Sequence, residues 1–174
     1  EWNYAPLDFV QLVQASVKGV HQLCLDKGIK VTETYAVDLP EIYGDRDRLT
    51  QVLVNLLGNA IKFCNQQKGH IWIEVKKRHQ SIILTVRDNG EGIPPEVQPY
   101  IFDKFSQFND HRSGRKQGSG LGLSITWRIV RHHKGHIQVR SEVGKGAIFQ
   151  VSLPIEPEQS FDEEALISRT YGLD

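Results

Sequence analysis

The clearest sign of chemistry in this sequence is a glycine-rich run, Gly118-Ser119-Gly120-Leu121-Gly122-Leu123, which opens an apolar segment with helical spacing. Glycines let a backbone approach a ligand closely, and the start of a helix presents free N–H groups and the positive end of its dipole. This combination predicts an anion site, most often for phosphate. It is not a Walker loop, which ends in Gly-Lys-Ser/Thr, nor a dinucleotide fingerprint, which has a small residue where Leu123 stands.

A stripe of polar side chains on an otherwise apolar helix is the second sign. Asn55, Asn59 and Lys62 are four and three residues apart, so a helix places them on one face. An amide oxygen can ligate Mg²⁺, and an ammonium group can pair with phosphate. The plain alternative is a solvated helix face.

Three further segments are weaker signals when each is taken alone. Asp88-Asn89-Gly90-Glu91-Gly92-Ile93 follows a strand, and its carboxylate could accept a hydrogen bond from an exocyclic amine; the alternative is a simple turn. Phe102 and Phe105 would anchor the base of a lid, or pack as ordinary core aromatics. Gly144-Lys145-Gly146-Ala147-Ile148-Phe149 is by itself typical of a hairpin turn.

The composition describes one ordinary globular domain. The chain has 174 residues, 39% hydrophobic and 24% charged, and a formal net charge of zero, so its charge favours neither nucleic acid nor an acidic membrane as a partner. Its apolar runs are too short to span a bilayer. Cys24 and Cys64 form neither a CxxC pair nor a disulfide framework, which favours a reducing, cytosolic compartment. The lack of methionine, even at position 1, indicates a piece of a longer protein.

The elements that must position these groups alternate between helix and strand. Helical spacing of apolar residues predicts three helices: one carrying residues 7–23, one capped by Asp45 and carrying residues 49–61, and one over residues 121–133. Alternating patterns predict strands at residues 29–37, 70–77, 81–87, 136–143 and 147–153. The polar stretch 109–117 is expected to be a mobile loop.

Consecutive strands imply hairpins, and this sets the expected architecture. The fold class is α/β, a two-layer α/β sandwich in which a mixed sheet carries its helices on one face. We expect one domain over residues 1–154, followed by an acidic C-terminal tail or linker over residues 155–174.

Taken together and in this order, the segments resemble the conserved boxes of sensor histidine kinases. The N box is matched by Asn55-xxx-Asn59-Ala60-x-Lys62-Phe63, and the F box by Phe102-xx-Phe105. The three glycine boxes are matched by Asp88-x-Gly90-x-Gly92-Ile93, Gly118-x-Gly120-Leu121-Gly122-Leu123 and Gly144-x-Gly146-xx-Phe149. The resemblance covers about residues 7–154, most of the chain. It implies the catalytic ATP-binding domain, of the GHKL or Bergerat fold shared with DNA gyrase and MutL.

The resemblance also implies roles for individual residues. Asn59 would ligate Mg²⁺ beside Asn55, Lys62 would face the phosphates of ATP, Phe63 would pack on adenine and Asp88 would bind its amino group. The expected catalytic residues are Asn55 and Lys62, the expected metal ligand is Asn59, and the expected cofactor-binding residues are Asn59, Lys62, Phe63, Asp88, Gly90, Gly92, Ile93, Phe105, Arg115, Lys116, Gly118, Ser119, Gly120, Leu121, Gly122 and Leu123.

Spacing does not fix the basic lid residue near the γ-phosphate. Lys104, Arg112, Arg115 and Lys116 are all candidates, and Arg115 and Lys116 rank first. The plain alternative is that basic residues on a loop are only solvated.

Two positions depart from the family's pattern. Ala147 stands where the last glycine box often has Thr, so a water-mediated contact near adenine is expected to be missing. His133-Lys134-Gly135 stands where His-Gly-Gly is common. His132, His133 and His136 could suggest a metal cluster, but no carboxylate or cysteine completes it, and we expect surface histidines at a helix end.

Asn55 separates a kinase from a hydrolase among the relatives. The ATPases that resemble this fold typically have a glutamate four residues before the Mg²⁺-binding Asn, where it acts as a base on water. An amide cannot accept that proton, so we expect poor hydrolysis and transfer of the γ-phosphoryl group to a nucleophile supplied elsewhere. None of the seven histidines precedes the Glu-xx-Thr-Pro pattern of the family's phosphoacceptor.

The expected partners follow from that missing nucleophile. They are the parent protein's own dimerisation and phosphoacceptor domain upstream, and a response regulator or receiver domain downstream; no nucleic acid is expected. The isolated domain should be a cytoplasmic monomer from a homodimeric parent, whose membrane anchoring stays open. Two other classes remain: a regulatory module that binds ATP and transfers nothing, and a serine kinase of the anti-sigma type, which shares the fold.

Overall fold

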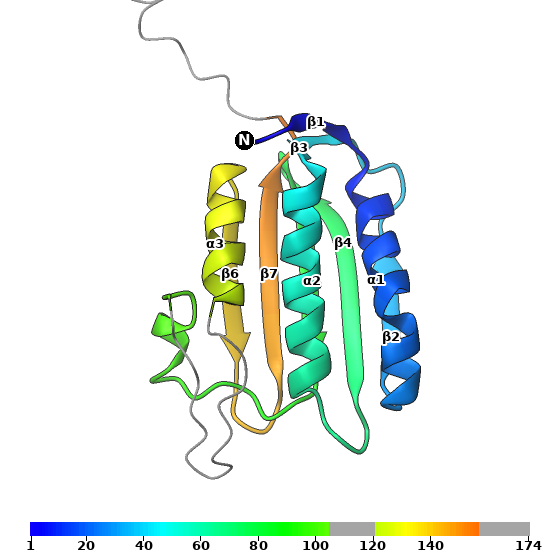
Figure 1. The fold of residues 1–174 in the computed structure, drawn as a ribbon, viewed down its shortest axis with the longest axis vertical. Helices are drawn as coiled ribbons and strands as arrows, with labels where there is room; N and C mark the ends of the chain where they lie inside the picture. The colour runs from blue at the N-terminus through cyan, green and yellow to red at the C-terminus, as the bar shows by residue number, and fades with distance from the viewer. Residues whose placement is uncertain (105–120, 157–174) are drawn as a thin grey trace, which may run out of the picture.

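The computed structural model describes residues 1–104 and 121–156, where a five-stranded sheet is covered on one face by three helices and a two-stranded ribbon closes one end (Figure 1). The elements, in chain order, are β1 (Tyr4–Leu7), α1 (Phe9–Asp26), β2 (Lys30–Tyr35), β3 (Ile42–Asp45), α2 (Arg46–Phe63), β4 (His70–Arg78), β5 (Ser81–Asp88), a short 3₁₀ helix (Gln98–Tyr100), α3 (Gly122–His132), β6 (His136–Ser141) and β7 (Ala147–Pro154).

The main sheet is mixed, with strand order β2-β4-β5-β7-β6. β2 pairs with β4 in parallel, whereas the other three pairs are antiparallel. Along β7, buried residues alternate with half-buried ones, because one face of the sheet packs under the helices and the other meets solvent. The predicted α/β sandwich with helices on one face is therefore confirmed.

Capping aspartates and apolar faces explain the two long helices. Asp8 accepts a hydrogen bond from Gln11 N at 3.0 Å, and Asp45 accepts one from Arg48 N at 3.0 Å, as the sequence predicts for Asp45. The buried face of α2 is made by the apolar residues that predict it: Leu49, Val52, Leu53, Leu56, Leu57, Ala60 and Ile61. Within the described residues, none of the helices has both the length and the apolar character that a bilayer crossing requires.

The sequence does not predict the β1–β3 ribbon, in which Tyr4 pairs with Asp45 and Leu7 with Ile42. Four-residue strands, one of which contains a proline, carry too little alternation to be recognised. Leu7, expected on the first helix, instead ends β1 and is 3% exposed. Leu23, expected on the apolar face of that helix, is 46% exposed, because α1 lies at the edge of the helical layer over β2 (Figure 1).

The expectation that His133 is a surface histidine is wrong. Its side chain, near the ribbon, is buried. The Asp45 N–H donates to Nε2 at 3.0 Å, so Nδ1 carries the proton and donates to the Ile129 carbonyl at 2.8 Å. Burial is the main cause that lowers the pKa of His133, against the opposing effects of the Ile129 carbonyl and the Asp45 carboxylate. A neutral imidazole thus links the end of α3 to the start of α2. His132 and His136 are exposed, as expected.

Candidate functional site

The predicted polar stripe runs along α2 toward the C-terminal end of this helix. Asn55, Asn59 and Lys62 are half-buried, whereas the intervening Leu56 and Ala60 are buried. At the end of the helix the Lys62 ammonium lies 5.1 Å from the centroid of the Phe63 ring, which is 39% exposed. At this end of the stripe, Lys62 therefore contacts an aromatic ring.

Asn55 connects this stripe to α3. Its Nδ2 donates to the Gly122 carbonyl at 3.0 Å and to Thr126 Oγ1 at 3.2 Å. Because a carbonyl can only accept, the amide nitrogen must be the atom that faces α3. The contact places the first turn of α3 directly beside the stripe.

The start of α3 has the features of an anion site. Leu121 stands at the N-cap, where its apolar side chain makes no capping hydrogen bond. The polar N-terminus of a helix without a side-chain cap offers its N–H groups and its dipole to a ligand. Gly122 and Leu123 begin the helix as predicted, whereas Gly118, Ser119 and Gly120 lie outside the described residues.

Asp88 lies at the end of β5 and is 6% exposed. Its Oδ1 accepts a hydrogen bond from Gly90 N at 2.8 Å. Burial raises the pKa of this carboxyl group, while the N–H groups of Gly90 and Ala147 hold it down. A carboxylate can accept several hydrogen bonds, so the buried Asp88 side chain could also accept one from an N–H group of a ligand.

Close backbone approach explains Gly90. A Cβ at this position would lie 1.8 Å from the carbonyl oxygen of Phe63, so only glycine lets the turn after β5 meet the end of α2. This approach packs the Asp88 turn against the backbone at the end of α2, which carries Phe63; the resemblance assigns Asp88 and Phe63 to the adenine ring.

The β6–β7 hairpin forms the other side of the Asp88 turn. Gly146 has a φ of 82°, and a Cβ there would lie 2.0 Å from the Asp88 carbonyl oxygen. Ser141 Oγ accepts from Ile93 N and donates to the Gly146 carbonyl, both at 2.7 Å. The last glycine box therefore does more than turn a hairpin: it supports the wall that carries Asp88 and Ile93.

Sequence reasoning missed three polar residues that hold this wall. Besides Ser141, Gln98 Nε2 donates to the carbonyls of Ile93 (2.8 Å) and Ser141 (2.9 Å). Asn89 joins the wall to the α2–β4 connection by accepting from His70 N (2.9 Å) and donating to the Lys68 carbonyl (2.7 Å). Asn89 could have been suspected from its place in an Asp-Asn-Gly turn, but no sequence signal marks Ser141 or Gln98.

Only some of the residues predicted to form the lid and its base lie within the described part of the chain. Phe102 packs edge-on against Phe149, with ring centroids 6.4 Å apart, and thereby joins the core at the expected base of the lid. Lys104 is exposed. Phe105, Arg112, Arg115 and Lys116 lie outside the described residues, as does the polar stretch 109–117.

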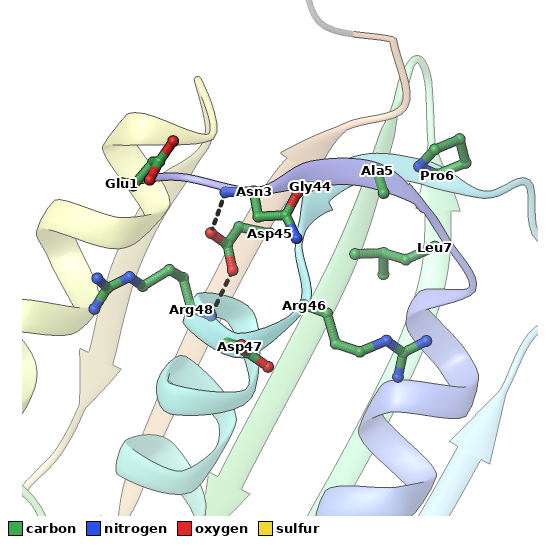
Figure 2. A pocket seen from close by; sticks show the side chains of 10 residues that line it. All are labelled: Glu1, Asn3, Ala5, Pro6, Leu7, Gly44, Asp45, Arg46, Asp47 and Arg48. Carbon is green, nitrogen blue, oxygen red and sulfur yellow. Dashed lines mark hydrogen bonds between the residues drawn. The ribbon is translucent and has the colours of Figure 1, made fainter.

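A pocket of about 420 Å³ lies at the other end of the molecule, beside the β1–β3 ribbon (Figure 2). Both oxygens of its central carboxylate, Asp45, are occupied, since Oδ2 accepts from Asn3 N at 2.8 Å and Oδ1 from Arg48 N. Burial alone would raise the pKa of Asp45, but these N–H donors and that of Asp47 outweigh it and lower the pKa. The 18 residues of α2 put this pocket about 27 Å from Phe63, so it is separate from the boxes.

Comparison with known proteins identifies the family of this arrangement. A model of the histidine kinase-, DNA gyrase B- and HSP90-like ATPase family matches residues 44–157. The chain belongs to this family. Similar curated proteins include the adaptive-response sensory kinase SasA of Thermosynechococcus vestitus, 40% identical over 150 residues that cover 86% of this chain and 39% of SasA. The methyl sulfide methyltransferase-associated sensor of Methanosarcina acetivorans is 40% identical over 129 residues, 74% of this chain and 13% of that protein. This ATPase-family chain thus spans less than half the length of these relatives.

Solved structures of histidine kinases share the fold of this ATPase-family chain. Full-length ShkA in complex with AMPPNP is 30% identical, with a TM-score of 0.78, and the match covers 88% of this chain and 31% of ShkA. The nucleotide-free catalytic domain of ThkA is 25% identical, with a TM-score of 0.77, and the match covers 89% and 99% of the two chains. The expectation of a sensor histidine kinase catalytic domain is therefore confirmed. The contacts of individual residues with a nucleotide stay predictions.

Proposed function

We propose that this chain binds Mg-ATP between α2, the Asp88 turn and the start of α3, and that it serves as the phosphoryl-donating domain of a sensor histidine kinase. One observation carries the proposal: the turn that holds the buried Asp88 packs against the end of α2, and the polar face of this helix leads to the start of α3, which has no side-chain cap. An adenine ring, a metal ion and a chain of phosphates need these groups in this order.

Each residue has a defined task in this proposal. Asp88 accepts a hydrogen bond from the exocyclic amine of adenine, and Phe63 covers the ring. Asn59 supplies an amide oxygen to Mg²⁺, and Lys62 pairs with a phosphate. The N–H groups at the start of α3 receive the other phosphate charges. The donor set is composed of oxygen and nitrogen groups suited to Mg-ATP.

The chemistry proposed for the site is positioning and charge neutralisation. Bound Mg²⁺ would neutralise charge on the phosphates, which favours transfer of the terminal phosphoryl group. Asn55 has no basic atom to activate water, because its amide nitrogen donates to α3 and an amide oxygen is a very weak base. We therefore infer that the domain hydrolyses ATP slowly and passes the phosphoryl group to a histidine on another domain.

The partners in this proposal are a dimerisation and phosphoacceptor domain and a response regulator or receiver domain. SasA is named as a sensory kinase and is much longer than this chain, which leaves room for the histidine-bearing domain. We propose that the isolated domain is monomeric and cytoplasmic, and that its parent is a homodimer.

Calorimetric titration of a non-hydrolysable ATP analogue into the chain, with and without Mg²⁺, tests the proposal. Wild type should bind more tightly with Mg²⁺, and Asn59→Ala should bind equally with and without it, because the metal loses its protein ligand. Asn3→Ala, at the other end of α2, is the matched control and should behave as wild type. A wild-type chain that ignores the analogue, or an Asn59→Ala variant that keeps the full effect of Mg²⁺, would contradict the site.

The identity of the acceptor needs a second experiment, in which the chain is joined to the upstream helices of its parent. Phosphate bound to histidine is lost in acid, whereas phosphoserine survives, so an acid-labile product supports the histidine kinase and an acid-stable one supports the serine kinase. A protein that binds ATP but never becomes labelled would be the regulatory module.

A further inference from the structure

A buried hydroxyl group on α3 touches the predicted site but belongs to none of the boxes. Thr126 is 0% exposed, and its Oγ1 lies 3.2 Å from Asn55 Nδ2. The rest of the buried face of α3 is apolar, formed by Ile129 and Val130. Burying a hydroxyl among such neighbours is unfavourable unless it is hydrogen-bonded, so the bond to Asn55 is what makes threonine acceptable at this position.

Thr126 and Gly122 act together on one amide group. They are four residues apart on α3 and therefore face the same side, toward α2. The two N–H bonds of Asn55 Nδ2 point to the Gly122 carbonyl (3.0 Å) and to the Thr126 hydroxyl (3.2 Å). An amide with both N–H groups engaged has its orientation fixed, and its oxygen is directed away from α3.

This arrangement sets the distance between two parts of the site. The first turn of α3 is where the phosphates are expected, and Asn59 and Lys62 lie one and two turns beyond Asn55 along α2. A bond near the start of α3 controls the spacing of these groups better than packing alone, because hydrogen bonds restrict both distance and direction.

We propose that Thr126 is a positioning residue: its hydroxyl, with the Gly122 carbonyl, holds the Asn55 amide and so fixes the phosphate-binding start of α3 against the metal-binding face of α2. The inference rests on the proposed function, because it assumes that Mg²⁺ and phosphates bind there. It adds a residue that no box contains and acts on the phosphate side of the site, since Asp88 lies at the end of β5 and Phe63 lies eight residues beyond Asn55, at the other end of the polar stripe.

The test compares Thr126→Val with Thr126→Ser in the chain as it stands. Valine fills nearly the same volume but cannot accept the hydrogen bond, whereas serine keeps the hydroxyl. The affinity for a non-hydrolysable ATP analogue with Mg²⁺ should fall about fivefold in Thr126→Val, as expected for one hydrogen bond, and be largely restored in Thr126→Ser. The affinity for adenosine, which has no phosphates, should change by less than about twofold, because adenine recognition is untouched.

Thr50→Val is the matched control. Thr50 also lies on a helix, and its hydroxyl donates to the Arg46 carbonyl at 2.8 Å within α2 itself. This variant loses a hydroxyl without breaking a bond between helices, so its nucleotide affinities should equal those of wild type. If Thr126→Val unfolds, Thr126→Cys replaces it, because a thiol packs in a similar space and accepts hydrogen bonds only weakly.

A double-mutant cycle with Asn55→Ala decides between positioning and general packing. If Thr126 acts through Asn55, Thr126→Val should have little further effect on analogue affinity once the amide is gone. Additive effects, equal losses for adenosine and the analogue, or wild-type binding by Thr126→Val would each overturn the inference. If wild type binds no analogue, the proposed function fails and the inference fails with it; if wild type binds and Thr126→Val binds equally, only the inference fails.

Discussion

At the scale of single residues, the most consequential feature of the candidate site is the buried carboxyl group of Asp88. Asp88 is almost fully buried, and burial raises its pKa above the ordinary value. For an acid, a folded-state pKa above the unfolded one means that stability is lost as the pH rises through the folded value. At neutral pH the ionised side chain therefore destabilises the free protein, and a ligand that donates a hydrogen bond to it relieves this cost.

Asp88→Asn separates the two effects. The amide keeps an acceptor for Gly90 N but presents N–H groups to the adenine amine, so ATP affinity should fall about 10- to 100-fold, the value of a charge-assisted hydrogen bond. The melting temperature of the nucleotide-free domain should stay equal or rise, since a buried charge is removed. Calorimetry and thermal unfolding check both parts. Unchanged affinity would remove Asp88 from the site.

A second residue-scale prediction concerns Lys134, which follows the end of α3. Its φ is 56°, in the left-handed region that is unfavourable for residues with a Cβ. Lys134→Gly should therefore stabilise the domain by about 0.5–1 kcal/mol, after allowing for the greater entropy of glycine in the unfolded chain. The urea midpoint measures this change, with Lys134→Ala as the control that keeps the strain. A lower midpoint for the glycine variant would refute the argument.

At the scale of elements, the sequence predicted the helices and strands whose apolar residues recur with a regular local period. The main-sheet strands and the three helices have clear periods, and Asp45 is a capping residue at the start of a helix. The β1–β3 ribbon has no such signal, because it depends on pairing between segments far apart in the chain. The burial of His133 was missed for the same reason: its partner, Asp45 N, belongs to another helix's cap.

The sequence predicted the segments of the candidate site but not the hydrogen bonds that connect them. Motif spacing located the Asn stripe, the Asp88 turn and the start of α3. It did not reveal that Asn55 bonds to Gly122 and Thr126, or that Ser141 and Gln98 brace the wall behind Ile93. These contacts are made between single side chains and distant backbone groups, so neither composition nor periodicity contains them.

At the scale of the whole molecule, the two ends of α2 have different surroundings. One end carries the predicted nucleotide site, and the other is joined to the ribbon and to the end of α3 through Asp45 and His133 (Figures 1 and 2). This second end contains a titratable link, because His133 accepts the Asp45 N–H only when its Nε2 is unprotonated.

The fold should therefore lose stability in mild acid. The pKa of His133 is lowered below its ordinary 6.5, so the unfolded chain binds the proton first and the contribution of His133, complete above pH 6.5, is lost as the pH falls below it. The slope attributable to this group is at most about 1.4 kcal/mol per pH unit. Urea unfolding from pH 7.5 to 5 measures it.

His133→Gln isolates that titration. The stability difference between wild type and His133→Gln should shrink as the pH falls. Parallel pH curves for wild type and His133→Gln would show that His133 does not titrate differently in the folded state.

The β1–β3 ribbon also has a mechanical consequence. β1 runs antiparallel to β3, and Tyr4, its first residue, pairs with Asp45 at the cap of α2. Tension on the preceding chain along the strand axis would load all four residue pairs together in shear. Tension across the axis would instead peel the ribbon from the Tyr4–Asp45 pair inward, one pair at a time. The direction of a pull thus decides whether the cap of α2 shares the load with the other three residue pairs or bears it first.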